Sequence, residues 1–164
     1  MKIKRPTLIV MTCGFFLLAD QFLKWQTLHG WRELALLHRF FGWSPFLNPG
    51  IAFGLPVPNW LVISLSIPII GLIFYLSWKM YDGGELRQAW AFALIFTGAL
   101  SNFIDRVTYQ NTVDYLRLFT GVINLADVLI VVGFAMYLIK QENKKARKQN
   151  IYEPVSREAE EKDG

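Results

Sequence analysis

Polar side chains of the kinds that move protons or bind ions are concentrated at the ends of four long apolar runs. They are Asp20, Asn102, Asp105, Arg106, Asn124 and Asp127, and Asp114 lies in the loop between the last two runs. A carboxylate or an amide near hydrocarbon is costly unless it has a partner, so residues placed in this way are functional by default. The chemistry open to such a set is proton transfer or ion binding.

The apolar runs span residues 7–27, 60–78, 88–105 and 123–140. Each is about 18 to 21 residues long, which suits a helix that crosses a hydrocarbon core about 30 Å thick. The 164-residue chain is 53% hydrophobic, too apolar for an ordinary soluble domain and long enough for one compact unit. We therefore expect one polytopic membrane domain over residues 1–142, with four transmembrane helices, followed by a polar, disordered cytoplasmic tail over residues 143–164.

The distribution of basic residues predicts how the runs are oriented. A net charge of +4 would also suit a nucleic-acid-binding protein, but the basic residues flank the runs. They are Lys2, Lys4 and Arg5 before the first run, Lys79 and Arg87 around the second loop, and Lys140, Lys144, Lys145, Arg147 and Lys148 after the fourth run. The positive-inside rule then places both termini in the cytoplasm and segments 28–59 and 106–122 outside. All of the polar clusters fall at one depth, near the outer face.

The first run has a rival interpretation as a cleavable signal peptide. No small-x-small cleavage site follows it, and the stretch continues into Asp20, Gln21 and Lys24. We therefore expect a retained helix. Cys13 lies inside that helix, where packing is its expected role.

Residue spacing suggests which side chains share a helix face. Gly98, Asn102 and Arg106 are four apart, so a neighbouring backbone can approach the glycine while the amide and guanidinium point toward it. Asp20 and Lys24 are also four apart and can form an ion pair. Asp105 and Arg106 are adjacent, so they point in different directions and are expected to serve different partners.

Structural interpretations remain open for several of these residues. Asp20 and Lys24 can be an interfacial ion pair only, and Asn124 with Asp127 has the spacing of a helix N-terminus. Arg106 can mark a membrane boundary. His29 and His38 lack the paired spacing of a metal site, so no metal is expected.

The outer segment 28–59 is too long for a simple turn. It is rich in aromatic residues and is interrupted by Pro45, Pro49, Gly50 and Gly54. This composition predicts short strands and turns on the membrane surface rather than a helix.

Five short motifs resemble one family when they are taken in order. They are DQFLK (20–24), NPGIAFG (48–54), GALSNFIDR (98–106), VDY (113–115) and NLAD (124–127). Their order and approximate spacing resemble lipoprotein signal peptidase, also called signal peptidase II, over residues 8 to 140. Five motifs in order on a four-span pattern are far more specific than any one of them.

The resemblance implies a fold, an activity and a set of site residues. The family fold is four transmembrane helices with a small β cradle and a short helix on the outer surface, for which segments 28–59 and 107–121 are available. Its members are bacterial inner-membrane aspartic peptidases that cut prolipoproteins before a diacylglyceryl-modified cysteine. The catalytic pair maps onto Asp114 and Asp127. The remaining motif residues map onto Asp20, Lys24, Asn48, Gly50, Ala52, Gly98, Asn102, Asp105, Arg106, Asn124 and Ala126.

The chain departs from the family pattern at a few positions. Ile123 replaces the usual aromatic residue before the NLAD motif, Val128 replaces a small polar residue after it, and VDY replaces the commoner VDF. Pro49 stiffens the turn in the second motif. None of these changes removes a catalytic carboxylate, so they bear on the shape of the pocket rather than on activity.

Amide hydrolysis by two aspartates is chemically reasonable without a cofactor or metal. Two close carboxylates that share one proton can activate water and protonate the leaving nitrogen, because like charges a few Å apart resist ionising together. The implied partners are prolipoprotein substrates and membrane lipids, with no nucleic acid, and the protein is expected to be a monomer.

Two other classes of membrane protein also keep acids among helices. A proton- or ion-coupled transporter would usually place them near the bilayer midplane, in inverted repeats that this sequence lacks. A head-group transferase that holds Mg²⁺ would need its acids at the cytoplasmic face. The outer placement predicted here argues against both, and a non-catalytic scaffold is the remaining alternative.

Overall fold

The computed structural model describes residues 5–30, 34–37, 40–50, 57–119 and 121–142. Its helices are α1 (Arg5–His29), α2 (Asn59–Asp82), α3 (Leu86–Tyr109) and a C-terminal helix that covers 125–142 of the described residues. Its strands are β1 (Leu34–Leu37), β2 (Phe41–Asn48), β3 (Thr112–Leu118) and β4 (Gly121–Ile123). Ala52 and the expected tail 143–164 lie outside the described residues.

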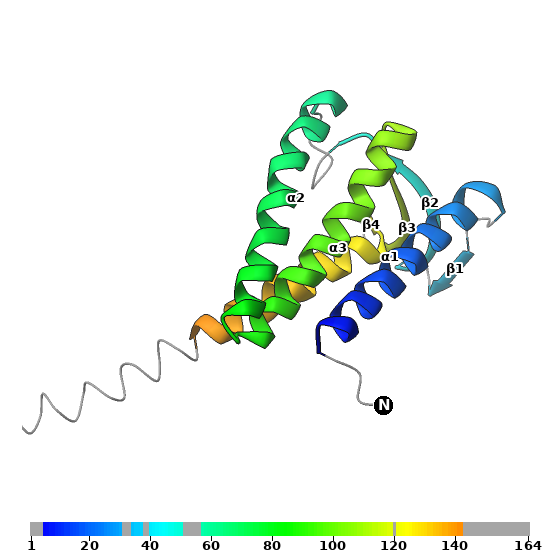
Figure 1. Ribbon diagram of the computed structural model, residues 1–164. Coiled ribbons are helices and arrows are strands. Elements are labelled where there is room, and N and C mark those ends of the chain that lie inside the picture. The colour runs from blue at the N-terminus through cyan, green and yellow to red at the C-terminus, as the bar shows by residue number, and fades with distance from the viewer. Residues whose placement is uncertain (1–4, 31–33, 38–39, 51–56, 120, 143–164) are drawn as a thin grey trace, which may run out of the picture.

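The four predicted apolar runs correspond to these four helices. Two of the described helices, α1 and α2, are long and apolar enough to cross a membrane. Helix α2 has no buried residue, and its exposed side chains include Trp60, Ile67, Leu72 and Phe74. Helix α3 instead buries a face of small and polar side chains, so it forms the centre of the bundle between α1, α2 and the C-terminal helix (Figure 1).

The C-terminal helix lies against α3 at two glycines. A Cβ atom added to Gly98 would lie 2.3 Å from the carbonyl oxygen of Ala126, and one added to Gly133 would lie 2.5 Å from that of Ala91. Only glycine permits such an approach between backbones. Since residue numbers rise along one helix as they fall along the other, the two helices are antiparallel. The close approach predicted at Gly98 is confirmed.

Helices α1 and α3 run parallel, as three contacts between them show. The Cys13 thiol lies 3.7 Å from the carbonyl oxygen of Ala93, Gln21 Nε2 lies 2.9 Å from Ser101 Oγ, and Lys24 contacts Asp105 farther along both helices. Their C-terminal ends therefore lie at the same end of the bundle. The antiparallel C-terminal helix begins at that end.

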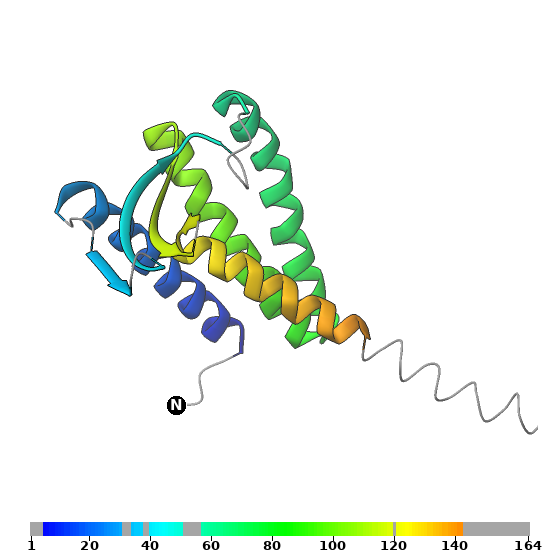
Figure 2. The same cartoon turned by 180° about the vertical axis from the view of Figure 1, so that it is seen from behind.

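The sheet lies at this same end of the bundle and has the order β1-β2-β3-β4, with every neighbouring pair antiparallel (Figures 1 and 2). Strand β2 pairs with β3 so that Asn48 lies opposite Thr112 and Phe46 opposite Asp114, with an irregularity between Trp43 and Phe46. The strands predicted for segment 28–59 are confirmed by β1 and β2. The short outer helix implied by the resemblance is not found in the parts of the outer segments that the structure describes.

Candidate active site

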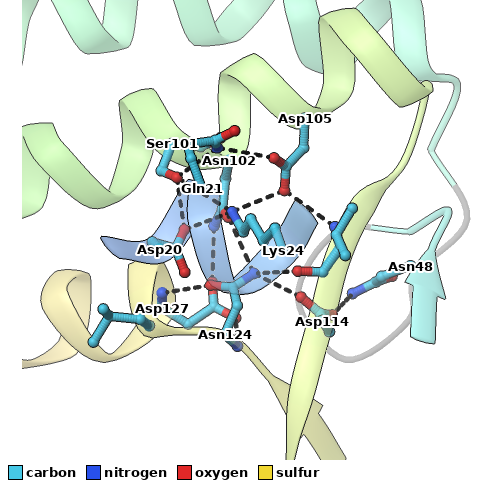
Figure 3. Close-up of polar contacts among 12 residues, drawn as sticks. Asp20, Gln21, Lys24, Asn48, Ser101, Asn102, Asp105, Asp114, Asn124 and Asp127 are labelled. Atoms are coloured by element: carbon cyan, nitrogen blue, oxygen red, sulfur yellow. Dashed lines mark hydrogen bonds and ion pairs between the residues drawn. The ribbon is translucent and has the colours of Figure 1, made fainter. Parts of the chain in front are cut away.

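Asp114 and Asp127 approach one another from different elements, through Asn124 (Figure 3). Asp114 lies on β3, and Asp127 lies in the first turn of the C-terminal helix. The side-chain amide of Asn124 donates to Asp114 Oδ1 at 2.7 Å and, more weakly, to the carbonyl oxygen of Val113 at 3.4 Å. One amide therefore joins the strand of the first aspartate to the helix of the second.

Asn124 also caps the helix on which Asp127 lies. The backbone N–H of Asp127 donates to Asn124 Oδ1 at 2.9 Å, and the backbone N–H of Asn124 lies 3.4 Å from Asp127 Oδ2. This reciprocal pattern satisfies backbone donors that a helix start leaves free. The N-terminus predicted from the spacing of these two residues is confirmed, and capping does not prevent Asn124 from contacting Asp114.

The second oxygen of Asp114 is bound by β2. Asn48 Nδ2 donates to Asp114 Oδ2 at 3.0 Å, and Asn48 Oδ1 accepts the backbone N–H of Gly50 at 3.0 Å. Asp114 is only 1% exposed. Burial, and after it the negative charge of Asp127, raises the pKa of the Asp114 carboxyl to about 7. Asp114 therefore holds a proton in the range where Asp and Glu side chains are usually ionised.

Asn102 of α3 holds the other aspartate. Its Nδ2 donates to Asp127 Oδ1 at 2.9 Å, while its Oδ1 accepts hydrogen bonds from Lys24 Nζ at 3.0 Å and from Asn124 Nδ2 at 3.1 Å. The orientation of the Asn102 amide is thus fixed by two donors on one side. As a result, Asp127 is approached by a side-chain N–H rather than by a carbonyl oxygen.

A buried ion cluster lies beside the two aspartates. Lys24 Nζ lies 2.8 Å from both Asp20 Oδ2 and Asp105 Oδ2, and all three side chains are almost completely buried. Ser101 Oγ donates to Asp20 at 2.6 Å, and Gln21 donates to Asp105 at 3.1 Å. A buried ion pair needs such additional hydrogen bonds to offset its desolvation. The predicted Asp20–Lys24 pair is confirmed, and it includes Asp105 as well.

Asp105 and Arg106 serve different partners, as their adjacency predicted. Asp105 Oδ2 also accepts the backbone N–H of Val113 at 3.1 Å, which ties α3 to β3. Arg106 donates to the carbonyl oxygen of Gly50 and to Asn59 Oδ1 on α2. The guanidinium therefore holds the chain that follows β2 close to the start of α2.

The structure brings together every predicted site residue that it describes. Gly98 and Ala126 form the contact between α3 and the C-terminal helix, at the base of the site. Within the described ranges, no group of three or more His, Cys, Asp and Glu side chains suits a metal ion.

Four residues that the sequence analysis did not assign to the site also take part in its hydrogen-bond network. They are Gln21, Asn59, Ser101 and Tyr115. Gln21 and Ser101 lie within the DQFLK and GALSNFIDR motifs, so the motifs themselves were the available signal. Tyr115 directly follows Asp114 in the VDY motif. Asn59 lies outside every motif, so nothing in the sequence pointed to it.

A buried carboxyl and a half-buried one, each with amide donors and with interacting charges, can perform general acid–base chemistry. The protonated carboxyl can donate to a carbonyl oxygen while the ionised one accepts a proton from water. The comparisons with known proteins agree with that capacity. Residues 12–141 match the family model described as signal peptidase (SPase) II.

The chain belongs to the signal peptidase II family. It is similar to lipoprotein signal peptidase of Listeria monocytogenes serotype 4b, with 30% identity over 129 residues, 73% of this chain and 83% of the relative. It is also similar to lipoprotein signal peptidase of Desulfitobacterium hafniense, with 38% identity over 118 residues, 66% of this chain and 75% of that protein.

Two solved structures of bacterial membrane enzymes share the fold. One has a TM-score of 0.75 and 21% identity over 86% of this chain and 91% of the other. The second has a TM-score of 0.71 and 24% identity over 82% of this chain and 92% of the other. The family membership and this fold agree with the resemblance carried by the five motifs.

Proposed function

We propose that this protein is a membrane aspartic endopeptidase that removes the signal peptide from diacylglyceryl-modified prolipoproteins, cutting before the lipidated cysteine. Its membership of the signal peptidase II family and its similarity to lipoprotein signal peptidases support this activity. The single observation that carries the chemistry is the bridge from Asp114 through Asn124 to Asp127.

In the proposed mechanism, Asp127 accepts a proton from water as the water oxygen attacks the scissile carbonyl carbon. Asp114, which is protonated in about half of the molecules at pH 7 because its pKa is about 7, donates in its protonated form to the carbonyl oxygen as that oxygen becomes negative. The tetrahedral intermediate then collapses: the C–N bond breaks, and the proton on Asp127 passes to the leaving nitrogen of the cysteine. Asp114 recovers its proton from the intermediate, so the pair returns to its starting state.

Asn48, Asn102 and Asn124 keep the two carboxylates in place during this cycle. Each donates a side-chain N–H to one of the two aspartates, and none is basic enough to take the proton from the carboxyl groups. Asp20, Lys24 and Asp105 support these donors from behind, since Lys24 also donates to Asn102. Arg106 and Gly50 keep the end of β2 close to Asp114 through their mutual contact.

The protein is a membrane protein, and we infer that all four helices span the bilayer as one domain over residues 1–142. The basic residues before α1 and after the fourth apolar run support cytoplasmic termini, as in a positive-inside topology. The site would then lie near the outer face. Because a diacylglyceryl group keeps its acyl chains in the bilayer, the bond beside the modified cysteine lies at this depth.

Exposed apolar side chains along the helices suit both lipid and a bound signal helix. Several belong to α1 and α2, including Phe15, Leu18, Phe22 and Leu65. We infer that substrate recognition depends largely on the lipid group, that the enzyme acts as a monomer, and that hydrolysis requires neither a cofactor nor nucleic acid.

The test is a gel-shift assay with purified full-length protein in detergent and a prolipoprotein substrate. The substrate is offered with and without its diacylglyceryl group. We expect cleavage of the modified form only, before the cysteine, and no loss of rate when a metal chelator is added. Equal cleavage of the unmodified form would contradict lipid-dependent recognition, and loss of activity with chelator would favour a metal-dependent enzyme.

A further inference from the structure

Tyr115 is a fully buried residue whose ring is fixed between the sheet and the helices. It follows Asp114 on β3, and neighbouring side chains on a strand point to opposite faces. The ring stacks on Trp43 of β2, with centroids 4.6 Å apart and an interplanar angle of 20°. The position of the phenol is therefore set by the sheet that carries Asp114.

The hydroxyl of Tyr115 makes two hydrogen bonds to other elements. It donates to Asp20 Oδ1 on α1 at 2.8 Å, and it accepts the backbone N–H of Leu125 at 3.1 Å. Leu125 is the first residue of the helix that carries Asp127, where backbone N–H groups have no partner within the helix. One oxygen atom thus connects β3, α1 and the start of the C-terminal helix.

The Tyr115 phenol keeps its proton at neutral pH, which favours this arrangement. Burial, and after it the negative charge of Asp20, raises the pKa of the Tyr115 hydroxyl above its ordinary value. The hydroxyl bonds Asp20 of α1, which shares an ion cluster with Lys24 of α1 and Asp105 of α3. A hydroxyl that keeps its proton donates to Asp20 and accepts from Leu125 without change.

We propose that Tyr115 is a positioning residue, whose hydroxyl fixes the first turn of the helix carrying Asp127 against the strand carrying Asp114. The inference rests on the proposed function, since it assigns the two aspartates to one reaction. Asn124 provides one connection between their elements, and the Tyr115 hydroxyl provides a second that does not pass through either carboxylate. A phenylalanine, the commoner residue in the resembling motif, fills the same space without this second connection.

Hydrogen–deuterium exchange of the full chain in detergent tests the connection independently of activity. The variants are Tyr115→Phe and, as a matched control, Tyr109→Phe, which removes a hydroxyl from an exposed tyrosine at the end of α3. We expect the amides of residues 125–127 to exchange about tenfold faster in Tyr115→Phe and at the wild-type rate in the control. Unchanged exchange at these amides would overturn the proposal.

Steady-state kinetics on the same variants test the consequence for the reaction. Because small displacements of reacting groups are costly, we expect kcat to fall about tenfold in Tyr115→Phe while KM changes less than about twofold. The melting temperature of Tyr115→Phe should fall, because the buried Asp20 carboxylate loses a donor, so both rates are measured well below either melting temperature. A wild-type kcat, or a loss of rate that merely follows the fraction of unfolded protein, would overturn the positioning role. Failure of the proposed function would give a different result, because the wild-type protein would then not cleave the prolipoprotein. The exchange measurement would still decide whether Tyr115 fixes the helix.

Discussion

Asn124 Nδ2 lies 2.7 Å from Asp114 Oδ1, although the two residues belong to different elements. The same asparagine caps the helix on which Asp127 lies, so its position is fixed by the backbone of that helix. Asn124, whose sequence position indicates only a helix cap, therefore also determines how Asp114 and Asp127 are placed relative to one another. Any change that moves the first turn of this helix also changes the environment of Asp114.

The raised pKa of Asp114 predicts a pH-dependent contribution to stability. The pKa of Asp114 is about 7 in the folded state and 3.8 ordinarily. Between these two pH values the folded state therefore holds a proton that the unfolded state has lost. The contribution is fully present below about pH 4, and it is lost as the pH rises toward about 7. Asp114→Asn removes this titration, so the melting temperature of the variant should rise relative to wild type across that interval.

Thermal unfolding of both proteins in detergent, from about pH 4 to about pH 8, checks the difference. Taking the difference cancels the titration of groups common to both proteins. The prediction is wrong if the gap between the two melting temperatures is the same at every pH.

Lys24 is predicted to be essential for stability because it separates two buried acids. Lys24→Met keeps most of the side-chain volume but leaves Asp20 and Asp105 without their shared cation. Removing one partner of a buried ion pair costs about 3 to 5 kcal/mol, so the free energy of unfolding should fall by at least about 3 kcal/mol. Denaturant titration in detergent measures this loss.

Lys79→Met is the matched control for Lys24→Met. Lys79 is an exposed lysine in the last turn of α2, near the ring of Tyr75. Exposed charges contribute little, so this change should alter stability by less than about 1 kcal/mol. Similar losses in both lysine variants would refute the role assigned to the buried cluster.

Gly98→Ala is predicted to displace the helix that carries Asp127. The new Cβ would lie 2.3 Å from the carbonyl oxygen of Ala126, so the helices must separate. Overpacking of this kind costs about 1 to 3 kcal/mol, and it should also lower kcat because Asp127 moves with its helix. Melting temperature and cleavage rate are measured together.

Gly71→Ala, in α2, makes the same chemical change where an added Cβ meets nothing within 4 Å. Since alanine is the better helix former, this variant should be neutral or slightly stabilised, with an unchanged rate. Wild-type behaviour of Gly98→Ala would show that the two helices need not approach so closely.

The helices and their polar ends could be predicted from the sequence because their signals are local. The apolar runs located all four helices, and the spacing of Asn124 and Asp127 located one helix start. The ends were less accurate: α3 was expected to stop at residue 105 but continues to Tyr109, and it ends where Gln110 adopts a left-handed φ of 60°. Polar side chains at the end of a helix do not interrupt its backbone hydrogen bonding, so the apolar run ends before the helix does.

The contacts between elements could not be predicted in the same way. Pairing of Asp20 with Lys24 follows from a four-residue spacing, whereas the addition of Asp105 depends on the parallel packing of α1 and α3. Likewise, the approach of Asp114 to Asn124 depends on how β3 pairs with β2 and packs on the helix ends. Nothing in the sequence indicated the hydrogen bonds of the Tyr115 hydroxyl, because an aromatic residue beside an acid is ordinarily a packing residue.

The central claim, that Asp114 and Asp127 form one catalytic pair, is tested most directly by replacing each with asparagine. Asparagine keeps the shape of the side chain but cannot exchange the proton. Asp82→Asn, at the exposed end of α2, is the matched control. Cleavage of the lipid-modified prolipoprotein is measured in parallel with the melting temperature of each variant. We expect Asp114→Asn and Asp127→Asn each to lower the rate about a hundredfold or more while remaining folded, and Asp82→Asn to cleave at the wild-type rate. Wild-type cleavage by either of the first two variants would contradict the account.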